Sequence, residues 1–324
     1  MKNLSIIIGT CAALLILALT GRYVSGHWIF ATFASFQIQG AALAAILSTL
    51  AWLLHRNRVA SLLVIASVMI GVHGYMMLGA FRQPQPMPPQ SWPATLKVLS
   101  MNIRGDNSFE NGGRIADFVI GSGADVVFIQ ESAPLGPHID RIKAVYPHRL
   151  GCGAQTITCD QSLWSKRPLL AGEVKTASPI YRDRLMLASI DFGGKRINFI
   201  NVHLTKPYFD NFQAIELKRI REELSKFVAS NEGPVVLAGD FNATILTSDI
   251  RRFLAGTDLM TAAREPETIP VEAPTLGVAI DHIFVGGPLR FKSLDRLPET
   301  FGSNHYGLMA EIWWQDLTIT YPPR

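Results

Sequence analysis

Three long apolar runs fill most of the first 81 residues and constrain the fold more than any other feature of the sequence. The runs are Leu4–Thr20, Ile29–Leu54 and Val59–Phe81, and none of them contains Asp, Glu, Lys or Arg. A helix of roughly 20 apolar residues crosses the ~30 Å hydrocarbon core of a bilayer. The helices of a soluble domain normally keep a polar face, which these runs lack. The sequence therefore predicts a membrane anchor of three transmembrane helices over residues 1–81.

Basic residues at the ends of the runs predict an orientation in the membrane. Lys2, Arg56 and Arg58 fall on one side of three spans, and Arg22 and Arg82 fall on the other. The positive-inside rule then places the N-terminus in the cytoplasm and everything after the third span on the extracytoplasmic, or periplasmic, side. The first run could also serve as a signal-peptide core, but no convincing cleavage site of small residues follows it.

A proline-rich stretch separates the anchor from the rest of the chain. Residues 82–93 contain five prolines, which exclude a helix and favour an extended spacer. We predict a linker at residues 82–95 and a second domain at residues 96–324. The length of 324 residues agrees with two structural units.

From Leu96 onward, short apolar strands alternate with amphipathic helices. Residues 124–132 contain the unbroken apolar run of a strand that is covered on both faces. Further strands are predicted at residues 96–103, 185–192, 196–204, 234–241, 279–285 and 307–314, and a helix at residues 111–123. A second helix, from about Asn211 to Ser230, has apolar residues at helical spacing: Ile215, Leu217, Ile220, Leu224 and Phe227. This alternation predicts a layered α/β sandwich.

Charge and cysteine content exclude few functions. The formal net charge of +4 and the pI near 9.0 fit a polyanionic substrate or a membrane surface without requiring either. Cys11 lies in an apolar run, whereas Cys152 and Cys159 lie in a Gly-rich polar stretch. The latter pair forms a disulfide or remains two free thiols; a disulfide would agree with an extracytoplasmic location. Zinc is not indicated, because no second Cys or His pair has the necessary spacing.

Polar side chains of only four residue types lie at the ends of the predicted strands. They are Asn102, Glu131, His203, Asp240, Asn242, Asp281 and His305. Carboxylates together with an Asn carbonyl form an oxygen-rich site suited to Mg²⁺ or Mn²⁺. Histidines donate to phosphate oxygens or transfer protons. The chain has neither a GxxxxGK[ST] phosphate loop nor a serine nucleophile elbow, so the pattern indicates metal-assisted hydrolysis.

The motifs around these residues resemble one family. SMNIRG, FIQES, NVHLT, AGDFNA, IDHIFV and GSNHYG follow one another in the order and rough spacing of the endonuclease/exonuclease/phosphatase superfamily. This superfamily includes deoxyribonuclease I, abasic-site endonucleases, neutral sphingomyelinases and inositol-polyphosphate 5-phosphatases. The resemblance covers residues 96 to about 314. It implies a four-layered α/β sandwich, in which helices flank two packed β-sheets, and dependence on a divalent metal.

The resemblance also implies a metal site. Glu131 resembles the principal ligand, with Asn102 beside it. The last motif departs from the family pattern, because Ser-Asn-His stands where Ser-Asp-His is usual. Asn304 keeps an oxygen ligand but removes one negative charge, so we expect weaker metal affinity or a changed metal preference.

Five further residues resemble the catalytic machinery of the family. Asp240 corresponds to the residue that orients or deprotonates the attacking water, and Asn242 to the donor that holds Asp240 and a phosphoryl oxygen. His203 matches a phosphate-binding histidine. Asp281 and His305 resemble a pair in which the carboxylate fixes the imidazole tautomer and supports its charged form.

Together these features predict a membrane-tethered, metal-dependent hydrolase of phosphate esters. The sequence leaves open whether its substrate is nucleic acid, a lipid headgroup or a small molecule, and it does not indicate the oligomeric state. Asn304 motivates an alternative, a catalytically impaired binding or assembly protein on the same fold. A transporter is disfavoured, because the only strongly polar residues within the spans are His73, Gln37 and Gln39.

Overall fold

The computed structural model describes residues 1–84 and 95–314, so most of the predicted linker lies outside the described residues. The chain divides into two compact units. Unit 1 contains residues 1–80, 206–211 and 243–252, and unit 2 contains the rest. Gln83 falls inside the predicted linker, yet it is buried in unit 2, where its amide bonds Leu289 O and Phe291 N.

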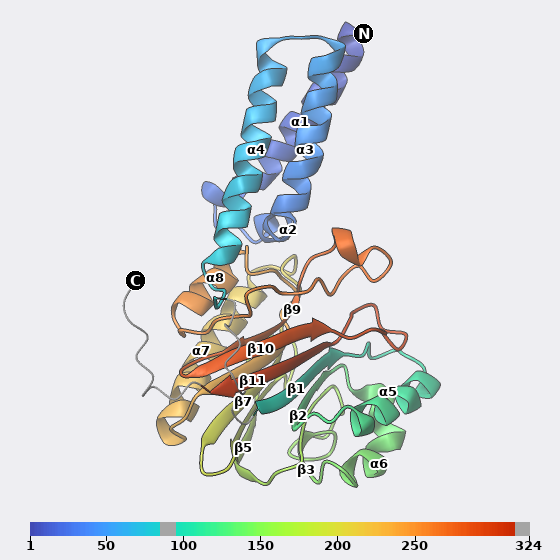
Figure 1. The fold of residues 1–324 in the computed structure, drawn as a ribbon, viewed down its shortest axis with the longest axis vertical. Helices are drawn as coiled ribbons and strands as arrows, with labels where there is room; N and C mark the ends of the chain where they lie inside the picture. Colours follow the sequence, from blue (N-terminus) through green and yellow to red (C-terminus); the bar gives the residue numbers. More distant parts are fainter. Residues whose placement is uncertain (85–94, 315–324) are drawn as a thin grey trace. The chain divides into compact units, whose positions relative to one another are not determined.

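Unit 1 is built on three long helices that lie side by side (Figure 1). They are α1 (Lys2–Thr20), α3 (Gln37–Leu54) and α4 (Arg58–Gly79), and each is long and apolar enough to cross a membrane. The short helices η1 (Gly21–Tyr23) and α2 (Ile29–Ser35) join α1 to α3. The second apolar run is thus two helices, because Phe36 leaves helical geometry, with φ −104° and ψ 22°.

The three helices bury mainly small residues, together with Leu19 and Ile70, and expose most of their large apolar ones. Ala12, Ala44 and Ser48 are buried between helices, whereas Leu17 and Ile65 are exposed. Gln37 is the main polar contact inside the bundle, with its Nε2 donating to Tyr23 Oη and to Ile70 O.

Two segments from later in the sequence belong to unit 1. In residues 243–252, Thr244 N donates to Ser35 Oγ at 3.3 Å, and Arg251 donates to Met77 O at 2.9 Å. The other segment is the loop at residues 206–211.

Unit 2 contains two mixed β-sheets. The six-stranded sheet has the order β10-β11-β1-β2-β4-β3, with only β1 and β2 parallel. Its strands are β1 (Thr95–Asn102), β2 (Val126–Gln130), β3 (His148–Gly151), β4 (Gln161–Ser165), β10 (Leu289–Arg296) and β11 (Leu308–Trp314). The five-stranded sheet has the order β5-β6-β7-β8-β9, with only β7 and β8 parallel. Its strands are β5 (Leu169–Lys175), β6 (Leu185–Asp191), β7 (Arg196–His203), β8 (Val235–Asp240) and β9 (Asp281–Val285).

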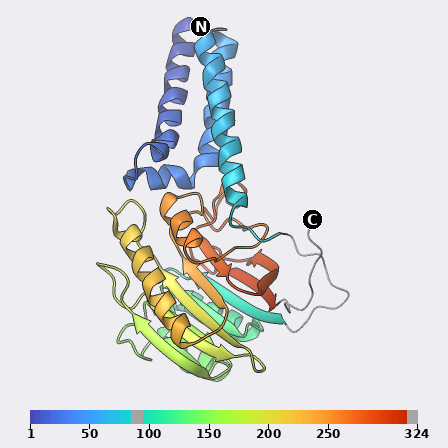
Figure 2. The same ribbon diagram turned by 90° about the vertical axis from the view of Figure 1, so that its left-hand side faces the viewer.

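The two sheets pack face to face, and helices cover their outer faces. Side chains from both sheets, such as Phe128 and Phe199, fill the core between them. On the outside of the six-stranded sheet, a second core lies under α5 (Phe109–Gly121), η2 (Ala133–His138) and α6 (Ile139–Lys143). Helix α7 (Phe212–Ser230) runs along the five-stranded sheet (Figure 2). The remaining helices of the described residues are the shorter α8 (Ser248–Ala255) and η3 (Pro274–Leu276). The predicted four-layered sandwich is confirmed.

Helix α7 departs from the predicted burial pattern. Ile215, which was expected in the core, is exposed, while Gln213 and Glu216 are buried. The first turns of α7 pack against polar backbone at the ends of β7 and β8, where Gln213 and Glu216 provide hydrogen-bond partners that an isoleucine cannot.

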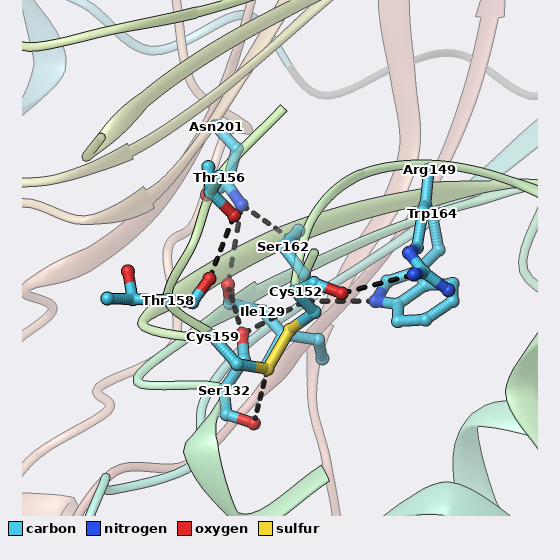
Figure 3. The surroundings of a disulfide bond; sticks show 10 residues. All are labelled: Ile129, Ser132, Arg149, Cys152, Thr156, Thr158, Cys159, Ser162, Trp164 and Asn201. Carbon is cyan, nitrogen blue, oxygen red and sulfur yellow. Dashed lines mark hydrogen bonds between the residues drawn. A yellow bond between two sulfur atoms is a disulfide. The ribbon is translucent and has the colours of Figure 1, made fainter. Parts of the chain in front are cut away.

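The loop between β3 and β4 is closed by a disulfide between Cys152 and Cys159 (Figure 3). The sequence alone did not decide between this disulfide and two free thiols. The sulfur of Cys159 lies 3.4 Å from Ser132 O. Ser132 N also donates to Asp160 O at 2.9 Å, so the disulfide loop packs against the turn that follows β2.

Candidate active site

Strand pairing brings the predicted polar residues to one edge of the sandwich. In the six-stranded sheet, Asn102 at the end of β1 pairs with Gln130, the residue before Glu131. In the five-stranded sheet, His203 pairs with Asp240, and Asp240 pairs with Asp281. The carboxyl ends of parallel strands lie at the same edge of a sheet, which explains why residues far apart in sequence meet here.

Asn102 connects the two sheets. Its side-chain nitrogen donates to Glu131 Oε1 at 3.0 Å and to Asp240 Oδ2 at 2.9 Å. Its side-chain oxygen accepts from Arg104 N at 3.0 Å. Because Asn102 is buried and donates both of its amide hydrogens, it fixes the spacing between the carboxylates of Glu131 and Asp240.

Glu131 is the most solvent-accessible carboxylate of the site, with 32% of its side chain exposed. Its backbone adopts the left-handed region, with φ +55°, which a non-glycine residue adopts at a cost of order 1 kcal/mol. Each carboxylate oxygen accepts one hydrogen bond, Oε1 from Asn102 and Oε2 from Gly105 N. A carboxylate has about four acceptor positions, so both oxygens retain capacity for a further partner.

Asp240 is buried and densely hydrogen-bonded. Its Oδ1 accepts from Asn242 N at 2.7 Å, and its Oδ2 accepts from Asn102 and from Asn242 Nδ2 at 3.2 Å. Burial, reinforced by the charge of Asp281, raises the pKa of Asp240 to about 7. A carboxylate with this pKa can take up a proton near neutral pH, as a general base must.

Asp281 and His305 form a hydrogen-bonded pair, with 2.8 Å between Asp281 Oδ2 and His305 Nδ1. Burial by itself would lower the pKa of His305, but the charges of Asp281 and Asp240 outweigh it and raise the pKa to about 9. The imidazole is therefore charged at neutral pH. Its Nε2 lies 4.0 Å from Asp240 Oδ2.

His203 and Asn242 complete the cluster. His203 Nε2 lies 3.6 Å from Asp240 Oδ2 and 3.9 Å from Glu131 Oε1. Asn242, with φ +52°, turns its Nδ2 toward Leu204 O at 2.8 Å as well as toward Asp240. His203 therefore presents a ring nitrogen beside both carboxylates, and the side-chain nitrogen of Asn242 holds Asp240.

The donor set fits a hard divalent cation. Ligand atoms of Asp240, Asp281 and His305 all lie within 4.8 Å of one another. Asp281 Oδ1 is buried and has no hydrogen-bond partner among residues 1–84 and 95–314. Glu131 adds a partly exposed carboxylate on the other side of Asn102. Oxygen-rich clusters of this kind suit Mg²⁺ or Mn²⁺.

The structure brings seven of the eight predicted site residues together. Asn304 is the exception, because its side chain is exposed and makes no hydrogen bond within the described parts of the chain. The three buried residues that could together hold an ion had been predicted as catalytic residues. The predicted ligands Asn102 and Glu131 adjoin them through Asp240.

Two residues that the sequence analysis missed orient this cluster from nearby loops. Ser303 Oγ donates to Asn102 O at 2.7 Å and accepts from His305 N at 3.1 Å. Thr268 Oγ1 accepts from Ile280 N and Asp281 N. Ser303 lies in the same short motif as His305, which was a usable signal. Thr268 lies in a loop that has no comparable pattern.

Helix α7 supplies two more supporting residues. Glu216 accepts from Thr205 N at 2.7 Å, and Gln213 donates to Thr205 O and Phe241 O. These bonds join the backbone that follows His203 to the backbone that follows Asp240. Burial raises the pKa of Glu216. Polar residues on the buried side of an amphipathic helix are the signal that was available for this pair.

The described residues form a two-sheet sandwich with Asn, Glu, His and Asp side chains gathered at one edge. The chain belongs to the Endonuclease/Exonuclease/phosphatase family, whose pattern matches residues 99–305. Members of this superfamily act as phosphoesterases, nucleases and sphingomyelinases, and they are generally metal-dependent.

Solved structures show the same fold. An endonuclease/exonuclease/phosphatase family protein from Leptotrichia buccalis is 15% identical, with a TM-score of 0.54, over 68% of this chain and 100% of that one. TDP2 from D. rerio, complexed with single strand DNA product, is 17% identical, with a TM-score of 0.54, over 68% and 99%. Sphingomyelinase C from Streptomyces griseocarneus is 17% identical, with a TM-score of 0.51, over 68% and 99%. No curated protein sequence matches the chain significantly.

Proposed function

We propose that the chain is a divalent-metal-dependent phosphodiesterase held at a membrane by three transmembrane helices. The observation that carries this proposal is the set of hydrogen bonds that joins Glu131, Asn102 and Asp240 across the two sheets. It places a partly exposed carboxylate beside a buried one whose pKa is raised to about 7. The first suits a metal ion and the second suits proton transfer.

Each site residue has a separate role in the proposed hydrolysis. Asp240 takes a proton from water as the water oxygen bonds to phosphorus, and the bond from phosphorus to the leaving oxygen breaks. The charged His305, oriented by Asp281, stabilises negative charge and can return a proton to the leaving oxygen. His203 offers a nitrogen donor that orients the phosphoryl oxygens, while the side-chain nitrogens of Asn102 and Asn242 hold the carboxylate of Asp240. Mg²⁺ or Mn²⁺ held by Glu131 and Asn102 would supply Lewis acidity to the phosphate.

The packing of unit 1 supports the membrane anchor. Large apolar side chains such as Leu17 and Ile65 face outward, and small residues such as Ala12 and Ala44 lie between the helices. A water-soluble bundle shows the opposite pattern, whereas close contact through small residues is typical of helices packed in lipid. The predicted extracytoplasmic location of unit 2 remains a proposal.

The alternative function, an impaired binding protein, was motivated by Asn304. The structure gives it no support, because the hydrogen-bonded site forms without the Asn304 side chain. The test is hydrolysis of bis-para-nitrophenyl phosphate by the full chain in detergent, with Mg²⁺, Mn²⁺ or a chelator. We expect metal-dependent turnover that falls at least 100-fold in Glu131→Ala and in His305→Ala. If turnover is absent and neither metal raises the melting temperature, the chain is a binding protein.

A further inference from the structure

The loop at residues 206–211 exposes two adjacent aromatic rings. Tyr208 is 47% exposed and Phe209 is 46% exposed, and their ring centroids are 4.9 Å apart. A turn, with Phe209 N donating to Lys206 O at 3.1 Å, holds both rings at the tip of the loop. Aromatic side chains are unfavourable in water and gather at the boundary between a bilayer and water.

A second loop exposes apolar side chains at the same edge of the five-stranded sheet. Ile180 is 49% exposed and Tyr181 is 38% exposed, in the connection between β5 and β6. That connection ends at Arg184, whose carbonyl accepts from His203 N. Both loops therefore leave the sheet beside His203, at the site edge and not at the opposite edge.

The aromatic loop belongs to the same compact unit as the apolar helices. Residues 206–211 cluster with α1, α3 and α4, as do residues 243–252. These two segments directly follow the catalytic strands β7 and β8. The chain thus passes from site residues into the unit that carries the proposed membrane spans.

Chain length limits how far the aromatic rings can be from the phosphate site. Tyr208 follows His203 by five residues, and a fully extended chain of that length spans at most about 18 Å. A single phospholipid is long enough to bridge that distance. The two loops carry the exposed cations Lys206 and Arg182 together with the acids Asp210 and Asp183, so their charge selects no particular headgroup.

We propose that the substrate is a phosphodiester lipid of the bilayer that holds the anchor, and that Tyr208 and Phe209 contact the surface of this bilayer. The inference rests on the proposed function and narrows its substrate. Water attacks the lipid phosphorus, a bond from phosphorus to an alcohol oxygen breaks, and that oxygen leaves as the protonated alcohol.

Single-stranded nucleic acid is the other ligand that stacks on exposed aromatic rings. The structure favours the lipid for two reasons. Ile180 has no ring on which a base could stack, and the loop with Tyr208 and Phe209 clusters with apolar helices.

The experiment uses the full chain reconstituted in phosphatidylcholine vesicles that contain phosphatidylglycerol, phosphatidylethanolamine or sphingomyelin. Each rate of lipid hydrolysis is divided by the rate of hydrolysis of bis-para-nitrophenyl phosphate. The latter rate measures the catalytic activity of the site without a bilayer substrate. We expect the wild type to cleave at least one of these phospholipids. We expect the double variant Tyr208→Ser, Phe209→Ser to lower the ratio at least tenfold.

The matched control is Leu170→Ser. Leu170 is also an exposed apolar residue of the five-stranded sheet, but it lies near Leu169, which pairs with Ile190 at the edge away from the site. We expect this variant to keep the wild-type ratio.

Three results would overturn the inference. The first is hydrolysis of bis-para-nitrophenyl phosphate without hydrolysis of any of these phospholipids, which leaves the proposed function intact. The second is an unchanged ratio in the double variant. The third is cleavage of single-stranded DNA, with none of lipid, that declines in the double variant. If even bis-para-nitrophenyl phosphate is not hydrolysed, the proposed function fails as well.

Discussion

Asp240 and His305 make the stability of the site depend on pH. His305 has an ordinary pKa of 6.5 when unfolded and about 9 in the folded protein, so between these values only the folded state binds the proton. Stability from this group is fully present below pH 6.5 and is lost as the pH rises through 9. The raised pKa of Asp240 changes the stability in the same direction at lower pH. Its contribution is lost as the pH rises from 3.8 through about 7.

We therefore expect the metal-free protein to melt at a lower temperature at pH 9 than at pH 6.5. The contribution of His305 is at most about 3 kcal/mol, which is the free energy equivalent to its pKa change. Thermal melting of the wild type and of His305→Gln, in chelator, measures the effect. The slope between the two pH values should be shallower in His305→Gln. Equal slopes would show that another group controls this pH range.

A second prediction at the residue scale separates the two possible positions of the metal. Glu131 has free acceptor capacity and is partly exposed, whereas Asp281 already binds the imidazole of His305. We expect Glu131→Gln to weaken Mn²⁺ binding at least tenfold, measured by calorimetry. We expect Asp281→Asn to lower turnover at least 100-fold while Mn²⁺ affinity changes less than threefold. The reverse pattern would place the ion among Asp240, Asp281 and His305.

At the scale of secondary-structure elements, the disulfide loop between β3 and β4 supports Glu131. Ser132 directly follows Glu131 and lies beside Cys159 of the disulfide (Figure 3), and its backbone nitrogen donates to Asp160 O. Its hydroxyl also lies 2.9 Å from Ser162 Oγ on β4. These contacts hold the turn in which Glu131 adopts φ +55°.

We expect the double variant Cys152→Ala, Cys159→Ala to lose roughly 2–3 kcal/mol of stability, because the unfolded chain is no longer constrained by the short loop. We also expect turnover to fall several-fold, with reduced metal affinity, because the Glu131 turn is less restrained. Denaturant unfolding and calorimetry measure the two effects. Cys11→Ala is the control and should change neither. Full metal affinity in the double variant would show that the loop does not position Glu131.

The same elements show what the sequence could and could not predict. The strands that hold the site have apolar runs that end in Asn, Asp, Glu or His, so both the strands and their site residues could be read from the sequence. Strands β3, β4, β5 and β10 are short or of mixed polarity, and their pairing depends on neighbours distant in sequence. Glu216 could not be placed by apolar spacing, because its burial depends on Thr205 N. Asn304 was assigned by its motif alone.

At the scale of the whole molecule, the proposed membrane anchor comes with a predicted orientation of the chain. The prediction depends on three basic residues, Lys2, Arg56 and Arg58, against two on the other side, Arg22 and Arg82. The disulfide agrees with an extracytoplasmic unit 2, because such bonds persist in oxidising compartments.

We expect protease added to right-side-out vesicles to digest unit 2, and protease added to inside-out vesicles to leave it intact. Replacing Arg56 and Arg58 by alanine changes the balance to one against two, so part of the population should then insert with unit 2 protected in right-side-out vesicles. Arg22→Ala increases the original difference and should keep unit 2 fully digestible there. Protection of the wild type in right-side-out vesicles would instead place the active site in the cytoplasm. The proposed lipid substrate would then belong to the inner leaflet, where the same aromatic loop would have to act.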